Sequence, residues 1–363
     1  MTTVRWTPRQ VPAELVERYL AEGFWNDRTL GSSLAAWLGK APATEVHVHS
    51  RTRPYHATFA DIDADARRLV SLLRSLDVAP GAVVAFQLPN WREALVTFAG
   101  LAMGGYVLVP IVHIYGRKEV GFILDQCGAQ AYISPAAYGH VDYLDIVENS
   151  DLPGLRHHIV VDTRSWDALY DLEPATELPT VAPTDIAVLA YTSGTTSDPK
   201  GVIHDHRTLL AELDHITPWI TPGKSNLMGS PVAHATGMLG AVLGPIETSS
   251  DIHLIDRWDP GHALEVMLEY GIGGGTGASV FLASLLDHPD FTPAHAANMG
   301  FIGLGGAPVP VALGLRAAEH GIAITRAYGS TEHPSTTGSR KDDPQRWRVY
   351  TDGPPRKGVE MRI

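Results

Sequence analysis

Short apolar segments alternate with amphipathic segments along almost the whole of this 363-residue chain. Uninterrupted apolar strands separated by helices are typical of parallel sheets that helices cover on both faces. The sequence therefore predicts an α/β fold, and the number of expected strands predicts two adjacent, mostly parallel sheets. These strands lie at residues 82–88, 106–111, 130–134, 157–162, 186–192, 226–230, 252–255, 301–305 and 322–328.

Local signals place the ends of several helices. Asn90 is a candidate N-cap for a helix that runs to Met103, because its side chain can accept a hydrogen bond from the first turn. Gly128 is expected to end a helix over residues 117–127. A further helical stretch is expected to begin near His204.

One segment interrupts the alternation. Residues 173–185 are rich in proline and threonine and have no hydrophobic periodicity, so we interpret them as a linker between the two sheets. The expected subdomains are therefore approximately residues 1–180 and 181–330.

Composition excludes several classes of protein. The chain has 28 basic and 40 acidic residues, a net charge of −12, which disfavours nucleic acid and anionic membranes as partners. Its single cysteine, Cys127, cannot form an internal disulfide and is expected to be a packed residue. The N-terminus has no apolar signal region, and no apolar run approaches the roughly 20 residues of a membrane helix. A cytoplasmic protein without integral membrane association is expected.

The segment with the clearest chemistry is YTSGTTSDPKG, residues 191–201. Hydroxyls and free backbone N–H groups in such a turn can surround phosphate oxygens, and Lys200 adds a positive charge. It is not a Walker P-loop, because the second glycine and the hydroxyl after the lysine are missing. From these residues alone, a phosphate-binding loop and an ordinary surface loop both remain open.

Other residues of chemical interest are expected to be structural. The histidine pairs at 47 and 49, 157 and 158, and 204 and 206 have no second Cys/His pair at zinc spacing. Neither HExxH nor G-x-S-x-G occurs, which disfavours a zinc protease and a serine hydrolase. The glycines between residues 271 and 277 do not form a dinucleotide fingerprint.

Residues 191–201, followed by VIHDHRTL, resemble the signature loop of the acyl-adenylate-forming superfamily, which includes acyl-CoA synthetases, adenylation domains and luciferases. The loop departs from the family pattern at Ser197, where glycine is usual. The N-terminal segments 17–31 and 131–147 look most like the branch of aryl-acid–AMP ligases and cyclohexanecarboxylate-type CoA ligases. Further segments resemble the family in the expected order, namely residues 59–111, PVAHATGM (231–238), GLGGAPVP (303–310) and AYGSTEHP (327–334).

This resemblance implies an acid–thiol ligase of fatty-acid metabolism. The enzyme would activate a carboxylic acid with ATP and Mg²⁺ to acyl-AMP, release pyrophosphate, and pass the acyl group to CoA. The resemblance also implies that this chain is the large N-terminal AMP-binding domain, with an αβαβα arrangement. Residues 331–363 would begin a small β-barrel subdomain, and the C-terminal lid domain would be missing. Little full ligase activity is therefore expected from the chain alone.

The resemblance assigns roles to individual residues. Lys200, Thr331, Glu332 and His234 would be catalytic, with Glu332 as the Mg²⁺ ligand. The small residues Ala235 and Thr236 favour an aliphatic or alicyclic acid over a catechol acid. The phosphate-binding residues would be Thr192, Ser193, Gly194, Thr195, Thr196 and Lys200. The adenine-binding residues would be Gly305, Gly306, Ala307, Tyr328, Gly329 and Ser330. The acyl pocket would contain His234, Met238, Gly277, Ala278, Ser279, Gly303 and Pro334.

Two alternatives stay open on sequence alone. The enzyme could pass its acyl group to a carrier-protein thiol, as the sibling adenylation enzymes do. The chain could also be a nucleotide- or acyl-binding module without turnover. The expected partner is a small-molecule carboxylic acid, and a homodimer is compatible with the sequence.

Overall fold

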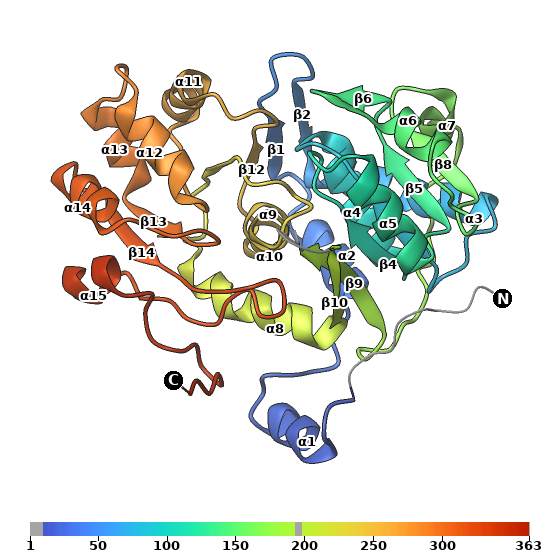
Figure 1. Ribbon diagram of the computed structural model, residues 1–363, viewed down its shortest axis with the longest axis horizontal. Helices are drawn as coiled ribbons and strands as arrows, with labels where there is room; N and C mark the ends of the chain where they lie inside the picture. The colour runs from blue at the N-terminus through green and yellow to red at the C-terminus, as the bar shows by residue number, and fades with distance from the viewer. Residues whose placement is uncertain (1–9, 193–197, 363) are drawn as a thin grey trace. The chain divides into compact units, whose positions relative to one another are not determined.

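The structure is a computed structural model that describes residues 10–192 and 198–362 (Figure 1). The chain forms two compact units, and each is built from segments that are not contiguous in sequence. The first unit contains the residues up to Ala43, Thr58–Ala211 and Val232–His234. The second contains Thr44–Ala57, Glu212–Pro231 and the residues from Ala235 onward.

The first unit is organised around a six-stranded sheet of order β10-β9-β4-β3-β5-β8. Its pairings are parallel, except that β10 runs antiparallel to β9. The central strands are buried throughout, as expected for a sheet covered on both faces. The strands are β3 (Val83–Phe86), β4 (Val107–Pro110), β5 (Ala131–Ser134), β8 (His157–Val160), β9 (Ile186–Thr192) and β10 (Lys200–Asp205), with a short pair β6 (Ala137–Tyr138) and β7 (Val141–Asp142).

The helices of the first unit follow clear local signals. Thr58 caps α3 in a capping box with Asp61, and Gly128 ends α5 in the left-handed conformation at φ 66°. Helix α4 is buried from Glu93 to its end and packs against α2 and α3. The helices are α1 (Ala13–Ala21), α2 (Leu30–Lys40), α3 (Phe59–Ser75), α4 (Arg92–Met103), α5 (Arg117–Cys127), α6 (Tyr143–Glu148) and α7 (Arg164–Asp167); α8 (His206–Ile216) continues into the second unit.

The helix expected to begin near His204 is present and starts at His206. Residues 200–205 form strand β10, and α8 begins only at His206. The strand exists because its backbone pairs with β9, with Lys200 opposite Thr192 and His204 opposite Val188.

The interpretation of residues 173–185 as a linker between sheets is wrong. Strands β8 and β9 lie on either side of this segment, and both belong to the six-stranded sheet. The segment has no regular secondary structure, but its backbone is tied to α3. Arg67 donates to the carbonyl of Ala175, and Arg74 donates to the carbonyl of Glu177. It is therefore a connection within one unit.

The second unit contains two further sets of strands. One is a four-stranded sheet of order β11-β12-β1-β2, in which β12 is parallel to both β1 and β11. The other is the parallel pair β13 and β14. The strands are β1 (Glu45–Val48), β2 (Tyr55–Thr58), β11 (Leu227–Met228), β12 (Ile252–Leu254), β13 (Phe301–Leu304) and β14 (Ala323–Arg326).

Helices pack around these strands on a core that includes Leu227, Met267, Leu282, Ile302 and Ile324. Residues 331–362 contain one helix and an isolated antiparallel bridge, and no barrel closes within residues 198–362. The helices are α9 (Ala235–Gly237), a π-helical segment (Met238–Leu243), α10 (Gly244–Thr248), α11 (Pro260–Tyr270), α12 (Ser279–Asp287), α13 (Pro293–Met299), α14 (Val311–Glu319) and α15 (Gln345–Tyr350).

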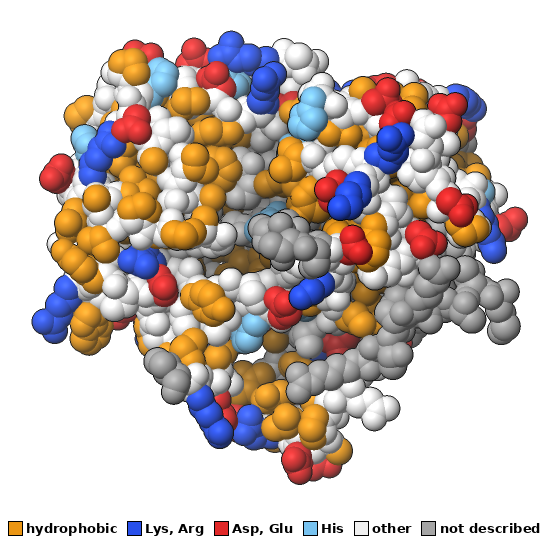
Figure 2. All heavy atoms as spheres, in the orientation of Figure 1, with side chains coloured by type: hydrophobic (Ala, Val, Ile, Leu, Met, Phe, Trp, Pro, Cys, Tyr) orange, Lys and Arg blue, Asp and Glu red, His pale blue; other side chains and the backbone are white. Residues whose placement is uncertain are grey.

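The prediction of an α/β fold with parallel sheets and flanking helices is confirmed. Cys127 is buried as expected, and burial raises the pKa of its thiol to about 12. None of the described helices is long and apolar enough to cross a bilayer. On the face shown in Figure 2, acidic and basic side chains are interspersed rather than gathered by sign.

Candidate functional site

Three segments of the second unit meet at the ends of the parallel strands β13 and β14. Loops that follow parallel strands emerge at the same edge of a sheet, and here they are the segments after Leu304 and Arg326. Gly277 joins this edge from a third segment. Its N–H donates to the carbonyl of Gly303 at 2.9 Å, and its carbonyl accepts from the N–H of Gly305 at 2.9 Å. The expected adenine and acyl segments are thus brought together.

Glycines allow this close approach. A Cβ on Gly277, whose φ is +96°, would lie 2.8 Å from Ser230 Oγ and 3.4 Å from Thr236 Cγ2. A Cβ on Gly306, whose φ is +72°, would lie 3.8 Å from Thr236 Oγ1. Both positions have a backbone conformation that side chains rarely adopt. Thr236 therefore lies between the expected acyl segment and the expected adenine segment.

The segment Tyr328–Pro334 forms a tight turn beyond β14. Ser330 and His333 exchange backbone hydrogen bonds of 3.0 and 3.1 Å, which close the turn around Thr331 and Glu332. A Cβ on Gly329 would lie 2.0 Å from the carbonyl oxygen of Pro334, so no side chain fits there. The ring of Tyr328 is 55% exposed and Glu332 is also exposed. The turn thus presents an aromatic ring and a carboxylate to solvent.

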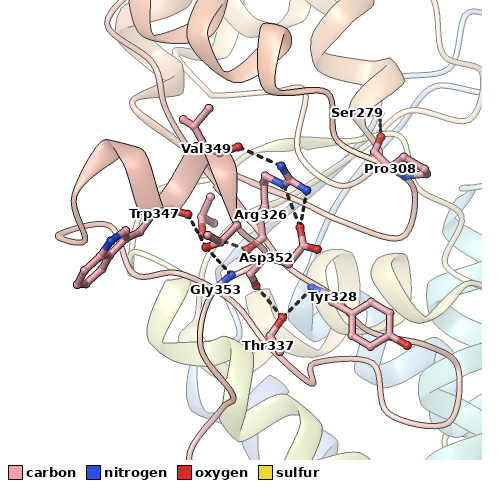
Figure 3. Close-up of polar contacts among 11 residues, drawn as sticks. Ser279, Pro308, Arg326, Tyr328, Thr337, Trp347, Val349, Asp352 and Gly353 are labelled. Carbon is pink, nitrogen blue, oxygen red and sulfur yellow. Dashed lines mark hydrogen bonds and ion pairs between the residues drawn. The ribbon is translucent and has the colours of Figure 1, made fainter. Parts of the chain in front are cut away.

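A hydrogen-bond network holds the base of this turn (Figure 3). Thr337 bonds both backbone groups of Tyr328 and donates its hydroxyl to the carbonyl of Asp352 at 2.6 Å. The Asp352 carboxylate pairs with Arg326 at 2.8 Å, and Arg326 also donates to the carbonyl of Val349. The turn is therefore tied to the strand before it and to the segment after α15.

Glu212 on α8 supports the other end of the turn. Its Oε2 accepts the N–H of Ser335 at 2.8 Å and also the Ser335 hydroxyl. Its Oε1 lies 2.6 Å from Nδ1 of His333. His215, one turn further along α8, contacts Ser335 Oγ at 3.1 Å and the carbonyl of Lys357 at 3.1 Å.

The ionisation of this cluster follows from its contacts. Burial by itself raises the pKa of Glu212. The hydrogen bonds with His333 and Ser335 lower this pKa by more than burial raises it, so the net shift is downward. The hydrogen bond with Glu212 raises the pKa of His333. Burial lowers the pKa of His215. These shifts favour an ionised Glu212 that holds the turn through charge-assisted hydrogen bonds.

Two expected phosphate-binding residues lie in the first unit. Thr192 ends β9 and Lys200 begins β10, and the two are paired in the antiparallel register. Thr192 Oγ1 lies 3.5 Å from the carbonyl of Lys200, whose side chain is exposed. The hairpin therefore fixes both ends of the expected loop. Ser193, Gly194, Thr195 and Thr196, together with Ser197, lie outside the described residues.

The remaining expected residues have varied surroundings. His234 is exposed and belongs to the first unit, whereas Met238 is buried in the π-helical segment of the second. Ser279, which follows Ala278 at the start of α12, donates to the carbonyl of Pro308 at 3.1 Å (Figure 3).

Asn90 has a role that its sequence position did not indicate. The predicted N-cap is wrong, because α4 begins at Arg92 and its cap residue is Trp91. The buried side chain of Asn90 instead accepts the backbone N–H of Val232 at 2.9 Å. This bond fixes the start of the motif that contains His234. Sequence reasoning also missed Glu212, Thr337 and Asp352, whose partners are distant in the chain or carry no local signal.

The fold is shared with solved structures that include the N-terminal domain of FACL13 from Mycobacterium tuberculosis. Residues 34–363 match the family described as AMP-binding enzyme, and the chain belongs to this family.

Named relatives of the chain are ligases and synthases that act with CoA. The chain is 26% identical over 357 residues to the medium-chain fatty-acid–CoA ligase of Escherichia coli, covering 95% of this chain and 63% of the relative. It is 28% identical over 282 residues to a feruloyl-CoA synthase of an Amycolatopsis species, covering 76% of this chain and 54% of the relative. The chain therefore spans less than two thirds of the length of either relative.

Solved structures of other proteins have a similar fold. The N-terminal domain of FACL13 from Mycobacterium tuberculosis superposes with a TM-score of 0.78 at 23% identity, covering 91% of this chain and 83% of that domain. The apo structure of MbtA from Mycobacterium smegmatis gives a TM-score of 0.81 at 22% identity, covering 96% and 65% of the two chains.

Proposed function

We propose that this chain is the adenylate-forming body of an enzyme that activates a carboxylic acid with ATP and transfers the acyl group to CoA. The observation that carries the proposal is the turn Tyr328–Pro334, which presents an exposed ring and an exposed carboxylate from a rigid base. Membership of the AMP-binding family and the named CoA ligases among its relatives support the same reaction.

The phosphate end of ATP is assigned to the β9–β10 hairpin. Lys200 and Thr192 would bind the oxygens of the departing pyrophosphate, together with Ser193, Gly194, Thr195 and Thr196 of the loop. An ammonium and a set of hydroxyls would offset the repulsion between the two anionic reactants and stabilise the charge on the leaving pyrophosphate. No nucleophile from the protein is required.

The adenosine end is assigned to the second unit. The Tyr328 ring offers a flat apolar surface for adenine, and the glycines at 305 and 306 with Ala307, Gly329 and Ser330 allow backbone approach. Thr331 would donate to the α-phosphate. Glu332 fits a Mg²⁺ ion, because its carboxylate is exposed at the tip of a closed turn and Mg²⁺ prefers oxygen ligands. When bound, that ion would neutralise phosphate charge.

The acyl group is assigned to the region around Thr236. Gly277 lies against Thr236, and the small size of Ala235 and Thr236 favours an aliphatic or alicyclic acid over a catechol acid. His234, Met238, Ala278, Ser279, Gly303 and Pro334 complete the proposed lining. An aliphatic or alicyclic acid is therefore the proposed substrate, in agreement with the medium-chain fatty-acid ligase among the relatives.

The test of the reaction is acid-dependent exchange of labelled pyrophosphate into ATP, measured on the full-length enzyme. A panel of aliphatic, alicyclic and aromatic acids separates the substrate classes, and exchange is expected with the first two. Free CoA and a holo carrier protein, offered in parallel, identify the acceptor. Absence of exchange with every acid, while ATP still binds, would contradict the proposal and favour a binding module.

A matched pair of lysine variants tests the hairpin. Lys200→Ala is expected to reduce the exchange rate about 100-fold, the order of loss when one charge-stabilising donor is removed. Lys224→Ala removes another exposed lysine, which is not part of the hairpin or of the proposed site, and should leave the rate unchanged. An unchanged rate in Lys200→Ala would exclude this lysine from the site.

A further inference from the structure

Three potential metal ligands lie together on neighbouring strands of the second unit, outside the proposed nucleotide and acyl site. Glu45 and His47 are two residues apart on β1, so their side chains project from the same face of the sheet. His56 comes from the neighbouring strand β2. The sequence concealed this group, because its two histidines lie on different strands and its third member is a carboxylate rather than a histidine or cysteine.

The ligand atoms converge. Nε2 of His47 lies 3.0 Å from Oε2 of Glu45, and Nε2 of His56 lies 3.6 Å from Oε1 of Glu45. The ligand atoms of the three residues all lie within 4.8 Å of one another. Ligands of one tetrahedral zinc ion stand about 3.4 Å apart, from bond lengths of about 2.1 Å. Small side-chain rotations would therefore place all three on one ion.

Packing holds the inner ligand in place. The His47 ring stacks between those of His56 and His253, at centroid distances of 4.5 and 4.6 Å, and the Tyr270 ring packs against it edge-on, with its centroid 4.9 Å away. His47 is 9% exposed, whereas Glu45 and His56 are 51% and 61% exposed. One ligand is thus fixed by the fold and two face solvent, which leaves room for water to complete the coordination.

The local charge favours a cation. Glu45 contributes a carboxylate that faces solvent. Asp251 adds a second carboxylate, whose Oδ1 accepts the backbone N–H of Glu45 at 2.9 Å. Beneath the site, His49 Nε2 and His253 Nδ1 lie 3.0 Å apart, so one of these two nitrogens must be an unprotonated acceptor.

We propose that Glu45, His47 and His56 bind a divalent transition-metal ion of the Zn²⁺ class. Two imidazoles and one carboxylate are a ligand set that Zn²⁺, Co²⁺ and Ni²⁺ accept, whereas Mg²⁺ prefers oxygen ligands alone. The site is therefore chemically distinct from the Mg²⁺ site proposed at Glu332. It does not depend on the proposed ligase reaction.

The test is metal binding by the untagged chain, stripped with a chelator and studied without nucleotide. Co²⁺ is added while its visible absorption is recorded, and Zn²⁺ binding is measured by calorimetry. One ion per chain is expected. Glu45→Gln and His56→Gln should each weaken binding at least tenfold, since about tenfold is lost even when an outer-shell partner is removed. Both residues are exposed, so the variants should fold, and thermal unfolding without metal verifies this.

His140→Gln provides the control, because it removes an exposed histidine in the first unit and should bind as the native chain does. Zn²⁺ should also raise the melting temperature of the native chain but not of Glu45→Gln, because a ligand stabilises only the state that binds it. Failure of the native chain to bind either ion would overturn the proposal. Equal binding by the native chain and by both variants would do the same.

Discussion

Replacing Glu212 by glutamine tests how the turn Tyr328–Pro334 is held. The native carboxylate accepts two hydrogen bonds from Ser335 and pairs with His333. Glutamine has nearly the same shape but no charge. Its amide oxygen can still accept from Ser335, while its amide nitrogen can only donate toward His333. The variant therefore removes charge without creating a cavity.

The magnitude can be worked from these contacts. A hydrogen bond to a charged group contributes about 1.5–3 kcal/mol and a neutral one about 0.5–1.5 kcal/mol, so the two bonds to Ser335 together lose about 2 kcal/mol. The pair with His333 adds less than about 1 kcal/mol, because the His333 side chain is 38% exposed and solvent screens it. Glu212→Gln should thus destabilise the folded state by about 2 kcal/mol.

Denaturant unfolding at pH 7 measures this loss, and ATP affinity, followed by ligand-induced stabilisation, reports whether the turn has moved. Glu265→Gln is the matched control, because Glu265 also faces a histidine, His262, at 3.4 Å but is 72% exposed. Its expected cost is below about 0.5 kcal/mol. The reasoning is refuted if Glu212→Gln is no more destabilising than Glu265→Gln.

Two further variants test the backbone and the pH response. Gly329→Ala would place a Cβ against the backbone of Pro334, so the free energy of unfolding should fall by about 1–3 kcal/mol and ATP should bind more weakly. Gly39→Ala is the control, because Gly39 lies in an exposed part of helix α2 and its replacement should not destabilise the chain. Burial lowers the pKa of His158 from 6.5 to about 4, so below pH 6.5 the unfolded chain takes up a proton that the folded chain does not. Stability is therefore lost as pH falls from 6.5 toward 4, by about 1 kcal/mol at pH 5.5, and denaturant unfolding should show a smaller loss in His158→Gln. An equal loss in both proteins would remove His158 as the cause.

Much of the fold could be predicted because its signals are local. The helix over residues 117–127 was predicted to the residue, since Gly128 supplies the left-handed end that few other residues allow. The strand at residues 200–205 was not predicted, because its extended conformation depends on pairing with β9. Residues 173–185 were wrongly interpreted as a linker between two sheets for a similar reason. Proline indicates an irregular segment but not which sheet the chain enters next.

The candidate site divides in the same way. Its motifs were recognisable by resemblance, and the structure brings Gly277, Gly305 and the segment after β14 to one edge. The supporting residues had no such signal. Glu212 is one of two acidic residues in helix α8, and its partner Ser335 lies 123 residues further along the chain. Only the folded chain shows that the two residues are hydrogen-bonded.

The interleaving of the two units has a consequence for dissecting this protein. The chain passes from one unit to the other after Ala43, Ala57, Ala211, Pro231 and His234. Any single cut between Ala43 and His234 therefore leaves at least one unit with its segments on two separate fragments. A split near residue 180, for example, would remove β9 and β10 from the sheet to which they belong. The units can be separated as continuous polypeptides only by rewiring their connections. New linkers would have to join Ala43 to Thr58 and Ala211 to Val232 in the first unit, and Ala57 to Glu212 and Pro231 to Ala235 in the second.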